Sequence, residues 1–500
     1  MLFNSYEFLL AFLPTVFAVH TLLRSQGLDR SAIAFLTIAS FAFYGWWNPV
    51  YLLLIGALIL ANYALVQAII RLSAAPRGLK RAVLVLAIVA NLCVLGYFKY
   101  VNFFIDNLNA LFGLDLFVAQ VVLPLGISFF TFQKIALLAD AYEGKIRDLN
   151  FLDYALFVLF FPQLIAGPIV HHSEAMPQFQ ARGRVPMSLI ALGITIFAIG
   201  LSKKVILADG AAIYAAPQFD AAASGARLSF LDAWSGALAY SLQLYFDFSG
   251  YSDMAIGAAL LFGVRLPLNF NSPYKARSMI DFWRRWHMTL SRFLRDYLYI
   301  PLGGNRRGRT RRYLNLFTTM VLGGLWHGAG WTFIVWGALH GVYLGINHAW
   351  EAVRGARGRG TAPSDVRRLA GQALTFLAVV IAWVFFRAND LPAAFAMLQA
   401  MAAINDLSPL TEFASQKPAG LEAFLVIGLL LSLVWLAPNT QELVVYVPPL
   451  PGFGLIREHE IRRGWLRWRP SPRWAVLVGC LVAASLMSLS KVSEFLYFQF

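Results

Sequence analysis

Charged side chains are scarce in this chain: 13% of its 500 residues are charged, whereas 59% are hydrophobic. A soluble domain usually carries about 25% charged residues, so this scarcity excludes an ordinary water-soluble protein. Cysteine is almost absent as well, since Cys93 and Cys480 are the only two and both lie inside apolar runs. Such a pair supports neither a disulfide framework nor a thiolate metal site.

Long apolar runs are what the sequence has instead. A transmembrane helix needs roughly 17–25 residues, and runs of about that length recur along the whole chain. Candidate spans are 7–23, 31–46, 50–70, 82–97, 119–139, 151–170, 187–207, 232–263, 313–326, 331–348, 371–387, 421–437 and 473–490. The first has no basic region or cleavage site of a signal peptide, so we expect it to be retained. The predicted fold class is an all-α polytopic membrane protein in which 1–500 form a single domain.

The net charge of +15 is explained in a membrane protein by the basic residues of its cytoplasmic loops. Lys and Arg collect in cytoplasmic loops because this bias sets orientation, so we expect no nucleic-acid partner. Residues 265–312 are the strongest inside segment, with twelve Lys and Arg against two Asp. Residues 350–370 and 456–473 are basic too, and the pattern places both termini outside. Residues 151–170 contain Pro162, Gly167 and Pro168, so this segment could re-enter rather than cross.

The stretch GGLWHGAGW, Gly323 to Trp331, sets one histidine among glycines and tryptophans. It is the far turn of a predicted helical hairpin, 313–348, between two cytoplasmic loops. The outgoing arm, Tyr313 to Trp326, has 14 residues and rises about 21 Å. A hydrocarbon core is about 30 Å thick, so we expect the turn and His327 to lie near mid-depth beside a cavity.

A second histidine lies in the cytoplasmic segment 281–312. The stretch DFWRRWHMTLSRFLRDYLY is two-sided when it is plotted at 100° per residue. One face holds Phe282, Trp283, Trp286, Leu290, Phe293, Leu294 and Tyr297, and the opposite face holds Arg284, Arg285, Arg292 and Arg295. This pattern predicts a basic amphipathic helix along the inner surface, with Asp281 as its N-cap. His287 falls on the apolar side and should point into the protein.

These histidines have to be weighed against structural roles. A lone histidine on an apolar face is more often a hydrogen-bonded core residue, which is how we interpret His340 and His348. Ionisable groups inside membranes are expensive, which favours a functional His327. Lys134 should pair with a carboxylate, and Asp247 and Asp253 must pair or face a polar cavity. His171, His172 and Glu174 lack further ligands, so no metal site is predicted.

Several motifs together resemble the membrane-bound O-acyltransferase family, particularly its bacterial branch that acts on cell-surface polysaccharides. The similar segments are SFAFYGWWNP, VLGYFKYVNFF, LPLGISFFTF, FPQLIAGPI, QLYFDFSGYSDMAIG, DFWRRWHMTLSRFLRDYLYIPLGGNRRG, LGGLWHGAGWTFIVWGALHG and the terminal FLYFQF. FWRRWH followed some forty residues later by GLWHG is the specific part.

The resemblance implies a bundle of about 11–13 spans, with partly inserted helices around a central tunnel, in a bacterial inner membrane. It implies His327 as catalytic base and His287 as a second catalytic residue that supports substrate placement. Residues expected on the donor side or in the tunnel are Trp326, Trp286, Trp283, Asp247, Asp253, Arg284, Arg285 and Asn305. The donor would be acetyl-CoA or another acyl thioester, with no bound cofactor.

The implied reaction is O-acetylation of an alginate-like extracytoplasmic polysaccharide, finished by a separate outer-face acetyltransferase partner. Three alternatives stay open at this point. One is D-alanyl transfer to teichoic acid from a carrier protein, which would use the same two histidines. Another is a proton-coupled transporter of polysaccharide or lipid-linked sugar, although no inverted repeat is visible. The third is a scaffold without chemistry, which leaves His327 unexplained.

Overall fold

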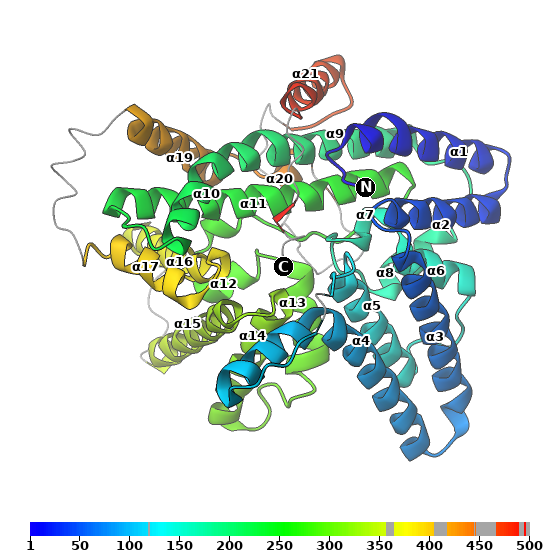
Figure 1. The fold of residues 1–500 in the computed structure, drawn as a ribbon. Helices are drawn as coiled ribbons and strands as arrows, with labels where there is room; N and C mark the ends of the chain where they lie inside the picture. Colours follow the sequence, from blue (N-terminus) through cyan, green and yellow to red (C-terminus); the bar gives the residue numbers. More distant parts are fainter. Residues whose placement is uncertain are drawn as a thin grey trace. The chain divides into compact units, whose positions relative to one another are not determined.

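The computed structural model describes residues 1–118, 121–356, 365–404, 418–444, 446, 467–489 and 495–496, and helices make up their regular structure (Figure 1). These residues divide into two compact units. One comprises residues 1–201, 251–268 and 444–494, and the other comprises 202–250, 269–443 and 495–500. Much of the basic stretches 350–370 and 456–473 lies outside the described residues.

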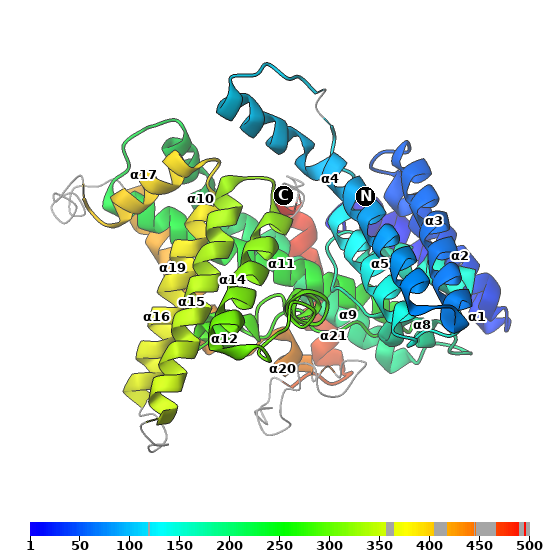
Figure 2. The ribbon, with the colours of Figure 1, turned by 90° about the horizontal axis from the view of Figure 1, so that it is seen from below.

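The first unit combines the N-terminal helices of the chain with residues 251–268 and a helix from the C-terminal part. Its helices are η1 (Glu7–Phe12), α1 (Leu13–Ser25), α2 (Asp29–Gly45), α3 (Tyr51–Arg71), η2 (Leu72–Ala74), α4 (Arg77–Phe112), α5 (Ile127–Tyr142), α6 (Phe151–Leu159), α7 (Phe161–Leu164), α8 (His172–Phe179), α9 (Met187–Ser202) and α21 (Pro472–Ser488). Figure 2 shows α3, α4 and α5 side by side. Reciprocal hydrogen bonds of 3.2 and 2.7 Å between Asn62 and Asn91 join α3 to α4.

The second unit contains both histidine motifs. Its helices are η3 (Lys203–Ala208), α10 (Asp209–Ala223), the first part of α11 (Phe230–Leu261), η4 (Pro273–Lys275), α12 (Met279–Trp283), α13 (Met288–Leu294), η5 (Arg295–Tyr299), α14 (Gly308–His327), α15 (Trp331–Ala356), α16 (Asp365–Arg387), α17 (Leu391–Met401), α19 (Pro418–Leu436) and α20 (Thr440–Val444). Helices α14, α15 and α16 pack as consecutive neighbours (Figure 2).

Glycines let α14 and α15 approach closely. A Cβ atom on Gly324 would overlap the carbonyl oxygen of Phe333, and one on Gly337 would overlap that of Met320. Larger residues at these two positions would therefore push the helices apart. The two helices form the predicted hairpin, and only Gly328 to Gly330 separate them.

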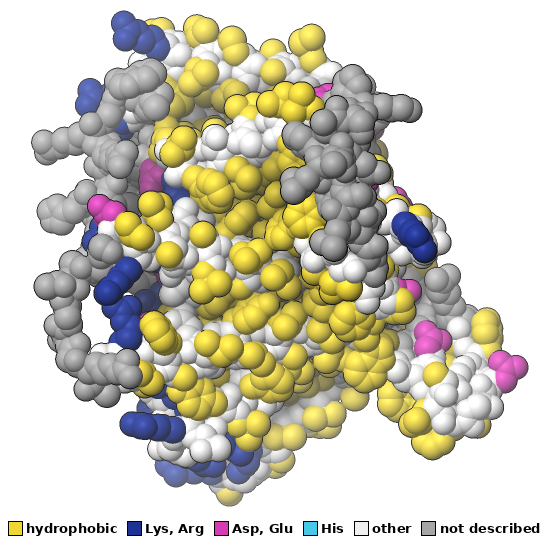
Figure 3. Space-filling view, turned by 90° about the vertical axis from the view of Figure 1, so that its left-hand side faces the viewer, with side chains coloured by type: hydrophobic (Ala, Val, Ile, Leu, Met, Phe, Trp, Pro, Cys, Tyr) yellow, Lys and Arg dark blue, Asp and Glu magenta, His cyan; other side chains and the backbone are white. Residues whose placement is uncertain are grey.

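Five helical segments in the described part of the chain are long and apolar enough to cross a membrane. They are Glu7–Ser25, Tyr51–Ala74, Arg77–Phe112, Met187–Ala223 and Asp365–Arg387. The predicted spans 7–23, 50–70, 82–97, 187–207 and 371–387 fall inside them, and the other predicted spans fall on shorter or less apolar helices. Figure 3 shows one face on which hydrophobic side chains predominate and Lys and Arg gather near the margins, as contact with lipid requires.

Three local expectations need correction. The span predicted at 119–139 does not start there, because α5 begins at Ile127, after a left-handed Gly126 with φ of 72°. Segment 151–170 is interrupted at Phe160 between α6 and α7, and after Leu164 it continues without regular helix. Lys134 is buried with its Nζ 4.8 Å from the ring centroid of Phe130, and among the described residues it pairs with no carboxylate. The ring face supplies the partial negative charge.

The arm that carries His327 is longer than predicted. Helix α14 begins at Gly308 and has 20 residues, which rise about 30 Å. The added first turn contains Arg309, Arg311 and Arg312, so the apolar part of the helix is still the predicted 14 residues. Mid-membrane placement of His327 therefore stays a prediction.

Candidate active site

The two motif histidines lie next to each other in the second unit. His327 is the last residue of α14, and His287 directly precedes α13. Their ring centroids are 6.4 Å apart, although 40 residues separate them in sequence. His287 is fully buried and His327 is 4% exposed. Two imidazoles therefore share one interior region, where both can act on the same small group.

The segment around His287 is not the continuous amphipathic helix that the periodicity predicts. Ser278, rather than Asp281, caps α12, because its hydroxyl accepts from the Asp281 backbone N–H. The helix then stops, and His287 adopts φ 41° and ψ 53°, in the left-handed region. For a residue with a Cβ this conformation costs roughly 1–2 kcal/mol, so the surroundings must hold it in place. The break turns the buried aromatic residues and His287 inward together.

Asn269 holds this strained residue. Its carbonyl oxygen Oδ1 lies 3.0 Å from Nδ1 of His287. The same oxygen accepts from the Thr289 backbone N–H at 3.3 Å and from the Thr289 hydroxyl at 2.9 Å. The Met288 N–H donates to the backbone carbonyl of Asn269 at 2.9 Å. Burial also lowers the pKa of His287 to about 3, which keeps the imidazole neutral at physiological pH.

A cage of aromatic rings surrounds His327. Its ring centroid lies 4.9 Å from that of Trp326, 5.0 Å from that of Trp336 and 5.2 Å from that of Phe386. Trp336 is in turn stacked on Trp383, with centroids 5.7 Å apart. These rings exclude water and hold the imidazole by packing, so its position depends on how α14, α15 and α16 fit together.

His340 belongs to the same cluster, one helical turn beyond Trp336. The indole N–H of Trp283 donates to its Nδ1 at 3.3 Å, and its ring centroid lies 4.8 Å from that of Trp336. Within the described part of the chain, the indole N–H of Trp336 is buried and makes no hydrogen bond. Sequence reasoning missed Trp336 and Asn269. The spacing of Trp336 and His340, four residues apart in WGALH, was the available signal, because such residues share a helical face.

The predicted tryptophans are buried beside the histidines. Trp286 stacks on Phe282 at 5.7 Å and lies 5.0 Å from Trp383. Trp283 is committed to His340 by its hydrogen bond, so it positions that ring. Trp326 adjoins both motif histidines, at 6.3 Å from His287 by ring centroids.

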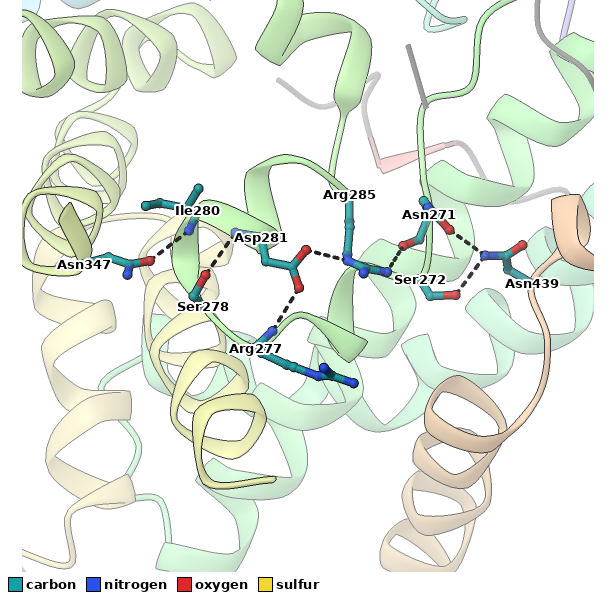
Figure 4. Close-up of polar contacts among 9 residues, drawn as sticks. All are labelled: Asn271, Ser272, Arg277, Ser278, Ile280, Asp281, Arg285, Asn347 and Asn439. Carbon is teal, nitrogen blue, oxygen red and sulfur yellow. Dashed lines mark hydrogen bonds and ion pairs between the residues drawn. The ribbon is translucent and has the colours of Figure 1, made fainter. Parts of the chain in front are cut away.

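The two arginines predicted on the donor side, Arg284 and Arg285, differ in exposure and in their contacts. Arg284 is exposed, whereas Arg285 belongs to a polar network around the start of α12 (Figure 4). In this network Arg285 Nε lies 2.8 Å from Asp281 Oδ1, and Asp281 Oδ2 accepts from the Arg277 backbone N–H at 3.1 Å. Arg285 therefore has a structural partner. Asn305 is exposed and lies in the turn before α14.

Asp247 and Asp253 are buried, but they belong to different units. Asp247 pairs with Lys204 at 2.7 Å, and Lys204 also contacts Asp209 at 2.9 Å. Asp247 also accepts the Leu496 backbone N–H at 3.2 Å. Removing Lys204 would leave this carboxylate buried without its cationic partner, which is strongly destabilising, so the contacts account for Asp247 by a structural role.

The described residues contain no group of three or more His, Cys, Asp or Glu that could hold a metal ion. The HHSE motif has other partners. The Glu174 carboxylate accepts the His171 backbone N–H at 3.0 Å, and His172 Nδ1 lies 3.2 Å from Asp140. These contacts begin α8 and join it to the end of α5.

Long apolar helices are typical of a multi-pass membrane protein, and the buried pair of histidines among tryptophans is its candidate active site. Residues 81–354, more than half of the chain and including both histidines, match the membrane-bound O-acyltransferase family. The chain belongs to this family and is an acyltransferase. Membership of this family excludes two of the alternative functions, the transporter and the scaffold without chemistry.

Curated relatives extend the likeness over most of the chain. It is 46% identical over 437 residues to a peptidoglycan O-acetyltransferase of Helicobacter pylori, covering 82% of this chain and 81% of the relative. It is 41% identical to a probable alginate O-acetylase of Azotobacter vinelandii over the full length of both. A teichoic acid D-alanyltransferase of Streptococcus thermophilus is 30% identical over 240 residues, or 45% of this chain and 57% of the relative.

Proposed function

We propose that the protein moves an acetyl group from a cytoplasmic thioester, acetyl-CoA, for O-acetylation of an extracytoplasmic polysaccharide. The observation that carries this proposal is the 6.4 Å separation of His287 and His327 inside the aromatic cluster. A buried neutral imidazole can take a proton from a hydroxyl at neutral pH. The names of the relatives, two of which are O-acetylating proteins, support acetyl as the transferred group.

In the proposed reaction, His327 takes the proton of the acceptor hydroxyl as its oxygen attacks the thioester carbonyl carbon. The carbonyl becomes an oxyanion, to which the buried indole N–H of Trp336 can donate. The C–S bond then breaks, and the thiolate leaves with the proton that His327 received. The new C–O ester is the product. The bilayer would separate the thioester on the inner side from the final acceptor outside.

The finer assignments follow the same proposal. The chain would lie in a bacterial inner membrane with both termini outside, since its basic loops favour the cytoplasm. Exposed arginines such as Arg284 would attract the phosphates of acetyl-CoA. A separate outer-face acetyltransferase would complete transfer to an alginate-like polymer, because residues 388–420, which include α17, are too few to form a second enzyme domain.

The test uses the purified protein in detergent with radiolabelled acetyl-CoA and a soluble sugar acceptor. His327→Ala should lower acetyl transfer by at least about a thousandfold, as expected for loss of a general base and its site. His348→Ala is the matched control, because His348 lies on the same hairpin but contacts Arg312 at 2.8 Å instead of the cluster. Full activity of His327→Ala would refute the proposed role.

D-alanyl transfer from a carrier protein is the second candidate, supported by the teichoic acid D-alanyltransferase among the relatives. The same preparation should be offered a D-alanyl carrier protein in parallel. Transfer from that donor, with none from acetyl-CoA, would replace acetylation by D-alanylation while keeping the two histidines in their roles.

A further inference from the structure

Three hydrogen bonds converge on one oxygen beside His287. Asn269 Oδ1 lies 3.0 Å from His287 Nδ1, 3.3 Å from the Thr289 backbone N and 2.9 Å from the Thr289 hydroxyl. A backbone N–H can only donate, so the Asn269 atom facing it must be the carbonyl oxygen rather than the amide nitrogen. The orientation of the amide is therefore determined by the Thr289 backbone N–H, independently of the histidine and of the Thr289 side chain.

This orientation determines the form of the imidazole. An amide oxygen only accepts, so Nδ1 of His287 must carry the proton that the 3.0 Å contact requires. In the other neutral tautomer, with the proton on Nε2, the lone pair of Nδ1 would face the lone pairs of Asn269 Oδ1 in a buried place. In a neutral ring with its proton on Nδ1, Nε2 carries the lone pair. His287 can then accept a proton or hydrogen bond at Nε2, and it cannot donate one there.

We propose that Asn269 is a positioning residue that holds His287 in its Nδ1–H tautomer, so that Nε2 of His287 is the acceptor of a substrate O–H or N–H group. This inference rests on the proposed function, and it assigns a different role to each of the two histidines. His287 accepts a hydrogen bond from the substrate while His327 takes the proton in the chemical step. Both the sugar hydroxyl and the amide N–H groups of a pantetheine arm have the required donor chemistry.

The backbone supports the same assignment. His287 is left-handed, with φ of 41°, and the Met288 N–H donates to the Asn269 carbonyl oxygen at 2.9 Å. Asn269 therefore holds both the main chain after His287 and its ring. Because the main-chain bond does not involve the Asn269 side chain, side-chain variants at position 269 should alter the tautomer more than the local fold.

Two variants at position 269 distinguish an effect on the tautomer of His287 from an effect on the local fold. Asn269→Leu removes the acceptor while it keeps a side chain branched at Cγ, and Asn269→Asp keeps an acceptor but adds a negative charge. Thr289→Val is the matched control, because it removes one bond to the same oxygen and leaves the His287 contact in place. Loss of a tautomer-fixing partner lowers kcat by about 10⁴ in a serine protease, so a fall of about a hundredfold or more is expected for Asn269→Leu.

In the acetyl-CoA assay, Asn269→Leu should lower kcat, and Thr289→Val should stay within about threefold of the unmodified protein. In Asn269→Leu, KM should rise for the sugar acceptor if Nε2 binds the sugar hydroxyl, and for acetyl-CoA if Nε2 binds the pantetheine amide. Asn269→Asp should remain active, with the acidic limb of its pH profile moved to higher pH. The sign follows because a carboxylate beside the ring raises the pKa of His287, so the neutral form is lost sooner as pH falls. Nitrogen-15 NMR of histidine-labelled protein should show the Nδ1–H signal of His287 change in Asn269→Leu.

Unchanged kcat in a folded Asn269→Leu, or an unshifted pH profile in Asn269→Asp, would overturn the positioning role. Should Asn269→Leu fail to fold, the Asn269→Asp profile decides by itself. Full activity of His287→Ala would also overturn the proposal. His327→Ala distinguishes failure of the tautomer assignment from failure of the proposed function. If His327→Ala is inactive and Asn269→Leu is fully active, only the tautomer assignment is refuted. If His327→Ala is active, the proposed function is refuted.

Discussion

His327 and His287 are neighbours in space, but different forces hold them. His327 ends a regular helix and is surrounded by rings, among them Trp336 at 5.0 Å. His287 lies in a left-handed break and is held by hydrogen bonds to Asn269. The first arrangement depends on close helix packing and the second on a few polar contacts. The comparison teaches that one site can combine a residue fixed by shape with a residue fixed by hydrogen-bond chemistry.

The largest effect should come from breaking the packing that holds His327. Gly337→Val places a side chain against the Met320 carbonyl oxygen on α14, so we expect a loss of about 3 kcal/mol in the free energy of unfolding. Thermal unfolding in detergent measures it. Gly345→Val in the same helix is the control, since a Cβ there meets no atom within 4 Å, and it should change stability by less than about 0.5 kcal/mol. Equal losses at both positions would contradict the packing argument.

A second prediction tests the cage without breaking it. Trp336→Phe keeps an aromatic ring and removes the buried indole N–H, so kcat should fall about a hundredfold if this group stabilises the oxyanion. Trp383→Phe removes an indole N–H that donates to the Tyr274 hydroxyl at 3.2 Å, and it should affect stability more than kcat. Steady-state acetyl transfer separates the two, and an unaltered kcat in Trp336→Phe would remove Trp336 from the chemistry.

The third prediction compares the backbones of the two histidines directly. At position 287 the Gly variant should be about 1 kcal/mol more stable than the Ala variant, because Gly adopts φ of 41° without strain. At position 327, in regular helix, the Ala variant should instead be about 0.5 kcal/mol more stable than the Gly variant. Because the Gly and Ala variants at each position both lack the imidazole, the difference in their stability reports the backbone conformation alone. The same sign at both positions in denaturant titrations would show that the strain at His287 is not real.

The smallest effects should come from the arginines near His287. Arg285→Ala removes the 2.8 Å contact with Asp281 and should cost about 0.5–1 kcal/mol of stability. Arg284 is exposed, so Arg284→Ala should leave stability unchanged and raise KM for acetyl-CoA about twofold at low salt. Measuring KM at two ionic strengths checks this. A salt-independent KM in the unmodified protein, or a KM at low salt that Arg284→Ala leaves unchanged, would exclude an electrostatic role in donor binding.

Much of this architecture follows from local pattern. The hairpin of α14 and α15 was predictable because apolar helical runs flank one glycine-rich turn between basic segments. Other predictions failed where a local rule met a tertiary requirement. The periodicity of DFWRRWHMTLSRFL suits a continuous helix, yet bonds from Asn269 and Asn271 to the chain around His287 stabilise a break. Lys134 packs on Phe130, which lies four residues earlier on the same helical face, but this spacing does not exclude a carboxylate from another helix as the partner.

The sequence by itself determined that this is a multi-pass helical membrane protein of the O-acyltransferase family, because composition, apolar runs and the two histidine motifs are properties of the chain as written. Only the tertiary structure decided which side chains meet those histidines. Trp336 and Phe386 reach His327 from other helices, and Asn269 reaches His287 from the loop before α12. Contacts between separate elements depend on packing geometry, which a one-dimensional pattern does not contain.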